Sequence, residues 1–100
     1  MDWLWTCGGE CFGYRVDDRL FTYSGLQIGR FDEDEVYGSD GCYLGEVMSK
    51  NRLITHRGKR SYRHSGFSPV RNGSYARYAN YAGYAMYVGY EDFPSPENFR

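Results

Sequence analysis

Residues 20–31, LFTYSGLQIGRF, decide the fold, because two glycines lie four residues apart inside an otherwise strand-like run. Glycine weakens the interior of a strand, so each of these glycines is expected to have a geometric reason. A tight turn explains Gly25, because the left-handed backbone region is open to glycine at little cost. A bulge or the close approach of another group explains Gly29. The stretch is therefore expected to fold as a β-hairpin.

The same spacing recurs along the first half of the chain. Three glycines are spaced by 16 residues and a fourth follows 17 residues later, at positions 9, 25, 41 and 58. Five residues before each glycine begins a pair of large residues, which are Leu4-Trp5, Leu20-Phe21, Val36-Tyr37 and Leu53-Ile54. After the first three glycines come Phe12-Gly13, Ile28-Gly29 and Leu44-Gly45. The repeated unit is Φ-Φ-x-x-x-G-x-x-Φ-G, where Φ is a large apolar residue, and it predicts a series of hairpins.

The two glycines of each unit have different predicted roles. The first glycines, Gly9, Gly25, Gly41 and Gly58, are expected in the turns. Asp40-Gly41 suits a two-residue turn with positive φ at both central residues. The second glycines, Gly13, Gly29 and Gly45, lie in the return strands. Because they recur at one register, we expect another backbone or ring to approach them closely.

These hairpins predict an all-β fold of four repeated β-hairpins about a pseudo-four-fold axis. A single hairpin is marginal in water, and closure into a ring or short barrel removes the exposed sheet edges. The fourth unit departs from the pattern, since Ser61-Tyr62 stands where Φ-Gly is expected. We therefore expect the last hairpin to pair with a segment that follows. Residues 1–66 are predicted to form the hairpin module and residues 67–100 a tyrosine-rich C-terminal extension.

The repeated units LFTYSGLQIGRF, VYGSDGCYLGEV and LITHRGKR resemble the four-fold beta flower proteins of bacteria. This resemblance covers about residues 3–61. It implies four hairpins placed like petals about a pseudo-four-fold axis. It implies no catalytic residue.

Charge is distributed unevenly along the chain. Residues 1–46 carry ten acidic and three basic side chains, whereas residues 47–90 carry eight basic side chains and no acidic one. One interpretation is that the two parts attract each other, within a monomer or between subunits. The alternative is that the basic segment 50–77 binds an anion or a nucleic acid. The first interpretation is preferred, because a basic stretch is an electrostatic footprint and not a site.

The three cysteines, Cys7, Cys11 and Cys42, are expected to be free thiols without a metal. Their number is odd, and the spacing of Cys7 and Cys11 is looser than in the usual zinc pairs. A zinc site or a Cys–His nucleophile that includes His56 remains an alternative. The residues 32–35, DEDE, are expected in a solvated loop. Since no apolar run or secretory signal is evident, we expect a cytoplasmic protein with no cofactor and no membrane contact.

Tyrosine recurs at every third position from residue 75 to residue 90. A three-residue period lines one side of a polyproline-II-like chain but winds around an α-helix. Candidate binding residues are Arg71, Tyr75, Arg77, Tyr78, Tyr81, Tyr84, Tyr87 and Tyr90. The preferred function is a non-enzymatic interaction or structural module whose tyrosine-rich tail docks in cis or between subunits, with itself or another protein as partner. The alternative is an accessory protein that binds RNA or single-stranded nucleic acid through residues 50–77 and the tyrosines.

Overall fold

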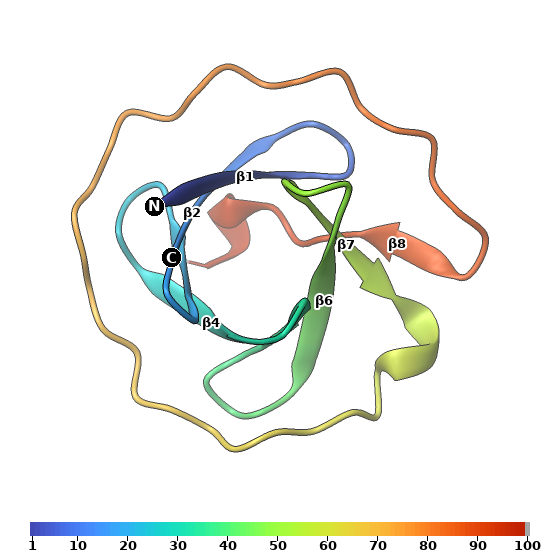
Figure 1. Ribbon diagram of the computed structural model, residues 1–100, viewed down its shortest axis with the longest axis horizontal. Helices are drawn as coiled ribbons and strands as arrows, with labels where there is room; N and C mark the ends of the chain where they lie inside the picture. The colour runs from blue at the N-terminus through green and yellow to red at the C-terminus, as the bar shows by residue number, and fades with distance from the viewer. Residues whose placement is uncertain (100) are drawn as a thin grey trace.

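The computed structural model describes residues 1–99, and within this range the chain is all-β, with two short 3₁₀ helices and no α-helix (Figure 1). The strands are β1 (Asp2–Thr6), β2 (Cys11–Val16), β3 (Arg19–Thr22), β4 (Gln27–Asp32), β5 (Glu35–Tyr37), β6 (Tyr43–Met48), β7 (Arg52–His56) and β8 (Tyr90–Asp92). The 3₁₀ helices are η1 (Arg57–Lys59) and η2 (Pro96–Asn98). No helix among the described residues has the length and apolar character needed to cross a membrane.

Strands β1 to β7 form a closed barrel. Each strand pairs in antiparallel fashion with the next one along the chain. A short parallel pairing of β1 with β7, at Trp5↔Arg52 and Thr6↔Leu53, closes the ring. Closure leaves these short strands with few unpaired edges, as the four marginal hairpins require.

The first glycines of the repeat lie in turns, as predicted for three of the four units. Gly9, Gly25 and Gly41 have φ values of +96°, +90° and +84°. Each is the last residue of a three-residue hairpin loop. Its N–H donates a hydrogen bond to the carbonyl of the residue just before the loop, which is Thr6, Thr22 or Gly38. The prediction of two positive φ values in the third turn is wrong, because Asp40 has none. The turn prediction for Gly58 is also wrong: this glycine lies in η1 without a positive φ.

The second glycines allow neighbouring hairpins to approach closely, which confirms the prediction. A Cβ at Gly13 would lie less than 3.0 Å from the backbone of Phe21 and Thr22 in β3. One at Gly29 would lie 2.6 Å from a methyl group of Val36 in β5. Each of the three strand pairs also carries a bulge beside the glycine. The group that approaches is thus the next hairpin in the ring.

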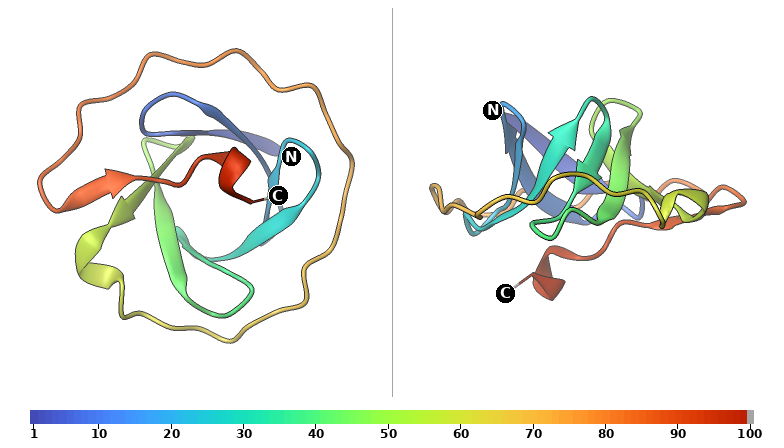
Figure 2. Two further views of the ribbon diagram at one scale, coloured as in Figure 1. Left: turned by 180° about the vertical axis from the view of Figure 1, so that it is seen from behind. Right: turned by 90° about the horizontal axis from the view of Figure 1, so that it is seen from below.

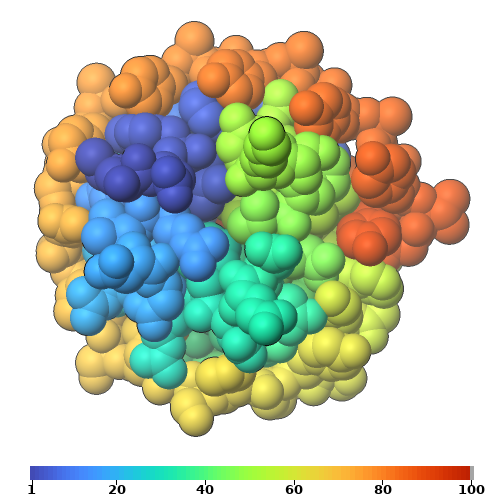
Figure 3. Space-filling view, in the orientation of Figure 1, coloured from blue at the N-terminus to red at the C-terminus, as the bar shows by residue number. Residues whose placement is uncertain are grey.

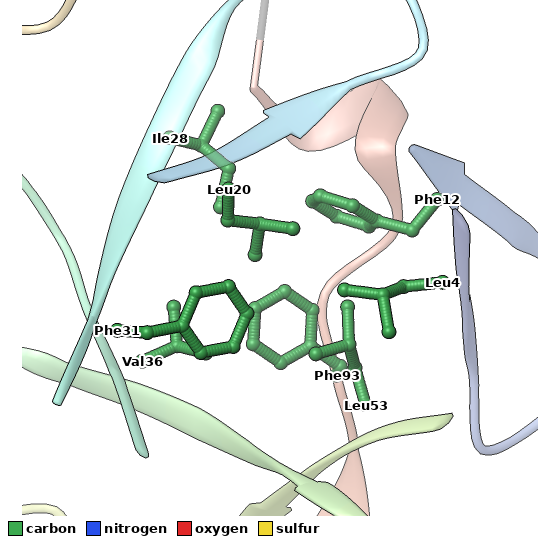
Figure 4. Packing of buried hydrophobic residues seen from close by; sticks show 8 residues of the cluster. All are labelled: Leu4, Phe12, Leu20, Ile28, Phe31, Val36, Leu53 and Phe93. Carbon is green, nitrogen blue, oxygen red and sulfur yellow. The ribbon is translucent and has the colours of Figure 1, made fainter. Parts of the chain in front are cut away.

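The core fills the inside of the barrel with one to three side chains from each hairpin (Figure 4). Its buried members are Leu4, Phe12, Leu20, Ile28, Phe31, Val36, Leu53 and Phe93. The core therefore contains the first large residue of every unit, Leu4, Leu20, Val36 and Leu53. It also contains Phe12 and Ile28, which directly precede the second glycines of the first two units. Leu44, the equivalent residue of the third unit, packs against the core while partly exposed.

The fourth hairpin is completed by a strand far along the chain. β8 pairs with β7 at Ile54↔Asp92, Thr55↔Glu91 and His56↔Tyr90. This confirms the expectation that the last unit pairs with a later segment. Phe93 follows directly and is buried in the core, where its ring meets that of Phe12 with centroids 5.2 Å apart. Residues from both predicted segments, 1–66 and 67–100, consequently share one sheet and one core.

Residues 60–89, named the belt here, connect the two strands of the fourth hairpin by a long detour. The belt runs around the outside of the barrel and passes the outer turns of the other three hairpins (Figures 1 and 2). From the side, the N-terminal end of the barrel lies on one face of the belt and the C-terminal segment on the other (Figure 2). The belt forms isolated bridges with the barrel at Leu26↔Arg71 and Cys42↔Arg63, and no strand ladder.

Candidate functional site

The belt is held at each hairpin turn by the same backbone interaction. The amides of His64, Asn72 and Tyr81 each donate a hydrogen bond of 2.8 Å to the carbonyl of a turn glycine: Gly41, Gly25 and Gly9, in that order. A Cβ on any of these glycines would lie less than 3.0 Å from a belt carbonyl oxygen. The turn glycines therefore serve two purposes, since they supply the positive φ and they let the belt approach.

The three-residue period of the sequence matches the period of these contacts. The amide of Tyr75 donates to the carbonyl of Tyr23 at 2.8 Å, and that of Tyr84 donates to the carbonyl of Cys7 at 2.9 Å. Together with Asn72 and Tyr81, the donating residues are all separated by multiples of three. An extended chain with three residues per turn presents every third amide to the same side. The repeat thus keeps one side of the belt on the barrel.

Aromatic side chains of the first hairpin lie beneath the tyrosines. Trp3 and Trp5 point to the same face of β1, because strand residues two apart share a face. The Trp5 ring stacks on Tyr81 with centroids 4.0 Å apart, and its indole N–H donates to the carbonyl of Ala79 at 3.0 Å. Trp3 meets Tyr78 edge-to-face with centroids 4.7 Å apart. Tyrosines of the belt therefore pack against the tryptophans of β1.

A buried arginine anchors the next part of the belt. Arg52 is only 5% exposed, and its guanidinium lies over the ring of Tyr84, 4.2 Å from the centroid. It donates hydrogen bonds to the carbonyls of Ala82 and Cys7. The sequence analysis missed Arg52 and the two tryptophans as partners of the tyrosines. The alternation Trp3-Leu4-Trp5 was an available signal for the tryptophans, because a leucine that faces the core places both of its neighbours on the outer face.

Five of the six predicted tyrosines form an outer strip on the belt, named the tyrosine strip here. Its members are Tyr75, Tyr78, Tyr81, Tyr84 and Tyr87, which remain 44–56% exposed although one side of each faces the barrel or a neighbouring ring. The space-filling view shows the belt as a rim of side chains around the barrel (Figure 3). The sixth, Tyr90, lies half-buried in β8 against His56. Val88, fully exposed, lies in the turn that leads into β8.

Of the two predicted arginines, Arg71 precedes this strip and Arg77 lies within it. Arg77 stacks over the Tyr23 ring at 5.3 Å and lies 3.8 Å from a carboxylate oxygen of Glu10. Arg71 lines a surface hollow between the second hairpin and η2, together with Tyr23 and Glu97. Arg77 is thus partly engaged within its own chain.

Ion pairs join the acidic and basic parts of the chain. Lys59 of η1 bonds to Glu35 at 2.8 Å and to Glu46 at 2.9 Å. Arg77 and Glu10 likewise join the basic part of the chain to the acidic part. Arg60 instead pairs with Glu91, which lies in the C-terminal segment. The interpretation that the two parts attract each other within a monomer is confirmed for these pairs. They also reduce the positive charge that the basic segment offers to an outside anion.

The three cysteines are free thiols. Cys7 and Cys11 are buried, and Cys42 is partly exposed. Burial raises the pKa of the Cys7 thiol, and so does the nearby Asp92, while Arg52 lowers it. Burial also raises the pKa of Cys11. Since the thiolate is the nucleophile and the metal ligand, these surroundings favour inert structural thiols. Among residues 1–99, no three Cys, His, Asp or Glu side chains come together as a metal site would require.

The acidic run 32–35 forms a solvated tight turn between β4 and β5, in agreement with the expected solvated loop. Glu33 has a φ of +55°, and Asp32, Glu33 and Asp34 are exposed. Lys59 lowers the pKa of Glu35 through its hydrogen bond. The role of this carboxylate is therefore to tie η1 to the third hairpin.

Comparison of the chain with models of protein families, with curated proteins and with solved structures finds no match. The resemblance to the beta flower proteins stays a prediction.

Proposed function

We propose that the chain is a non-enzymatic interaction module in which the barrel is a rigid support and the belt, docked in cis, presents the tyrosine strip to a partner. The observation that carries this proposal is that the backbone and the tyrosine side chains of the belt have different roles. Its backbone amides bond to the barrel, while about half of each strip tyrosine stays open to solvent. Tyrosine provides large contact area at low entropic cost, with a hydroxyl for hydrogen bonding.

The partner that best fits the strip is another protein surface, with a second copy of this chain as the first to test. Between Arg77 and Glu91 the belt has no charged side chain. Two strips can therefore lie against each other without repulsion between like charges. Met86 and Val88 add apolar exposed surface beside Tyr84 and Tyr87. Such aromatic and methionine-rich patches are typical of interface cores.

Light scattering after size exclusion, over a series of protein concentrations, tests this proposal. We expect a dimer or larger species that dissociates on dilution and that is lost in the double variant Tyr84→Ser/Tyr87→Ser. Tyr62→Ser is the matched control, because Tyr62 is similarly exposed but lies outside the strip. A species that stays monomeric at every concentration would refute self-association. Equal loss in the control would show that the strip is not the contact.

The second candidate function is binding of RNA or single-stranded nucleic acid. It is favoured by the exposed aromatic rings next to Arg71 and Arg77, since bases stack on such rings. It is disfavoured by the ion pairs of Lys59, Arg60 and Arg77. Fluorescence anisotropy with a labelled single-stranded oligonucleotide, at low and high salt, separates the two: salt-sensitive binding that requires Arg71 and the tyrosines would support this candidate.

The finer architecture is proposed together with this function. We take the four hairpins as petals about an approximate four-fold axis, as in the beta flower family. Support comes from the equivalent pairings Leu4↔Gly13, Leu20↔Gly29 and Val36↔Gly45, each next to a bulge. β8 and Phe93 then supply the missing part of the fourth unit. The free thiols fit a reducing compartment such as the cytoplasm.

A further inference from the structure

The two tryptophans and three exposed tyrosines of the strip form a chain of aromatic rings on the outer face of the first hairpin. Successive centroids are 5.9 Å apart for Tyr75–Trp3, 4.7 Å for Trp3–Tyr78, 6.3 Å for Tyr78–Trp5 and 4.0 Å for Trp5–Tyr81. Tyr75 is 44% exposed. The last pair is stacked with only 15° between the ring planes. Neighbouring rings at such separations exchange electrons readily, because their π systems lie close to contact.

The rings of this chain differ in their access to water. Trp5 is 6% exposed, and its indole N–H is hydrogen-bonded to the carbonyl of Ala79. Tyr78 and Tyr81 are about half exposed. An oxidised phenol becomes a stable radical only after its proton leaves, and water accepts that proton at an exposed hydroxyl. The buried indole has no such acceptor, because its N–H faces a backbone carbonyl.

We propose that the ring chain carries one-electron oxidation from Trp3 and Trp5 to Tyr75, Tyr78 and Tyr81, which are therefore the sites of oxidative modification. A one-electron oxidant removes an electron from an indole, and a neighbouring phenol returns an electron to it. The phenol proton passes to water, and the indole regains its reduced form. A tyrosyl radical remains at the surface.

The product follows from the chemistry of that radical. Two tyrosyl radicals join through ring carbons, and the hydrogen on each joined carbon then moves to the oxygen of the same ring as a proton, which restores the phenolic hydroxyl. In total, two tyrosines lose two electrons to the oxidant and two protons to water, and one dityrosine forms. A free tyrosine derivative in solution serves equally well as the second phenol, so the proposal does not depend on self-association.

Pulse radiolysis with the azide radical, which oxidises indole in preference to phenol, tests the transfer in the intact chain. The azide radical becomes azide anion and leaves a tryptophan radical. We expect the tryptophan-radical absorption to decay as the tyrosyl absorption grows, at a rate independent of protein concentration. With N-acetyltyrosinamide present, mass spectrometry is expected to locate the adduct on Tyr75, Tyr78 and Tyr81.

Conservative variants keep the rings and the fold while removing the redox step. The triple variant Tyr75→Phe/Tyr78→Phe/Tyr81→Phe is expected to abolish the rapid tyrosyl growth and to leave oxidation on the tryptophans. Tyr87→Phe is the matched control, because Tyr87 is the most exposed of the strip tyrosines but its ring contact is with Tyr90. Adducts mainly on Tyr87, or tyrosyl growth that persists in the triple variant, would show that exposure alone selects the site and would overturn the proposal. Circular dichroism of each variant verifies that the fold is intact.

Discussion

The docking of the belt on the hairpin turns is best tested at a pair of glycines that share a backbone conformation. Gly25 has a φ of +90° and Gly89 a φ of +85°. The carbonyl of each also accepts one backbone hydrogen bond, from Asn72 and Arg57 respectively. They differ in their surroundings, since a Cβ at Gly25 would meet the carbonyl of Asn72 at less than 3.0 Å, whereas a Cβ at Gly89 would have no atom within 4 Å.

Alanine at both positions separates backbone strain from steric exclusion of the belt. The positive φ costs about 1–2 kcal/mol for alanine, which is partly offset by about 0.4–1 kcal/mol because alanine restricts the unfolded chain. Gly89→Ala should therefore destabilise by about 1 kcal/mol. Gly25→Ala adds an overpacking cost of about 1–3 kcal/mol. The expected difference of about 2 kcal/mol corresponds to a difference in Tm of about 8–16 °C for a chain of this size.

Denaturant unfolding and amide hydrogen exchange together measure this effect. If the belt lifts from the turn instead of straining the barrel, the amides of Asn72 and Tyr75 should lose protection in Gly25→Ala and keep it in Gly89→Ala. The reasoning would be refuted by two variants of equal stability with equal protection at these amides. Such a result would mean that the belt does not depend on the glycine at the turn.

Three further predictions follow from the packing and the pKa shifts. Gly13→Ala should destabilise by about 3 kcal/mol, and more than Gly29→Ala, because the Cβ at position 13 meets the backbone of β3 whereas the Cβ at position 29 meets a side-chain methyl group of Val36; equal midpoints in denaturant would contradict this. Phe93→Ala should cost about 3–5 kcal/mol and expose the C-terminal segment to limited proteolysis, since it leaves a cavity in the core; a resistant, equally stable variant would argue against its role in completing the fourth hairpin. Burial, together with the hydrogen bond that it donates to Glu35, raises the pKa of Tyr37 to about 12, so the folded state favours the neutral phenol. That contribution is complete below about pH 10 and is lost as the pH rises towards 12, so Tm should fall less steeply over this range in Tyr37→Phe than in the natural chain.

The hairpins could be predicted from the sequence because their signals are local. A turn glycine such as Gly25 and an aliphatic residue such as Leu20 lie within one unit, and the repetition of the unit fixes their register. The turn at Gly58 was predicted wrongly, since the fourth unit has no adjacent return strand to impose a hairpin turn there. The same absence explains why only a later segment, and not β8 itself, was predicted as the partner of β7.

The path of the belt could not be predicted from its own residues. Its amides bond to turn carbonyls that are distant in sequence, as Tyr81 does to Gly9. A three-residue period is compatible with an extended chain but does not identify the surface on which it lies. The three-residue period of the tyrosines is visible in the sequence and matches the spacing of the belt amides that bond to the barrel, whereas the buried Arg52 beneath them has no signal in a single sequence. The charge distribution predicted attraction between the two parts of the chain but not which residues pair.

The placement of β8 after the belt also has a consequence for synthesis on the ribosome. The first seven strands emerge before the belt, and 33 residues separate His56 from Tyr90. At about 5–20 residues per second, several seconds pass in which the nascent barrel lacks its last strand and the ring of Phe93. During this interval residues 54–56 of β7 have an unpaired edge and the core has an open apolar end, both of which invite association with other chains. The nascent chain should therefore be a substrate for a holdase chaperone until the belt has closed.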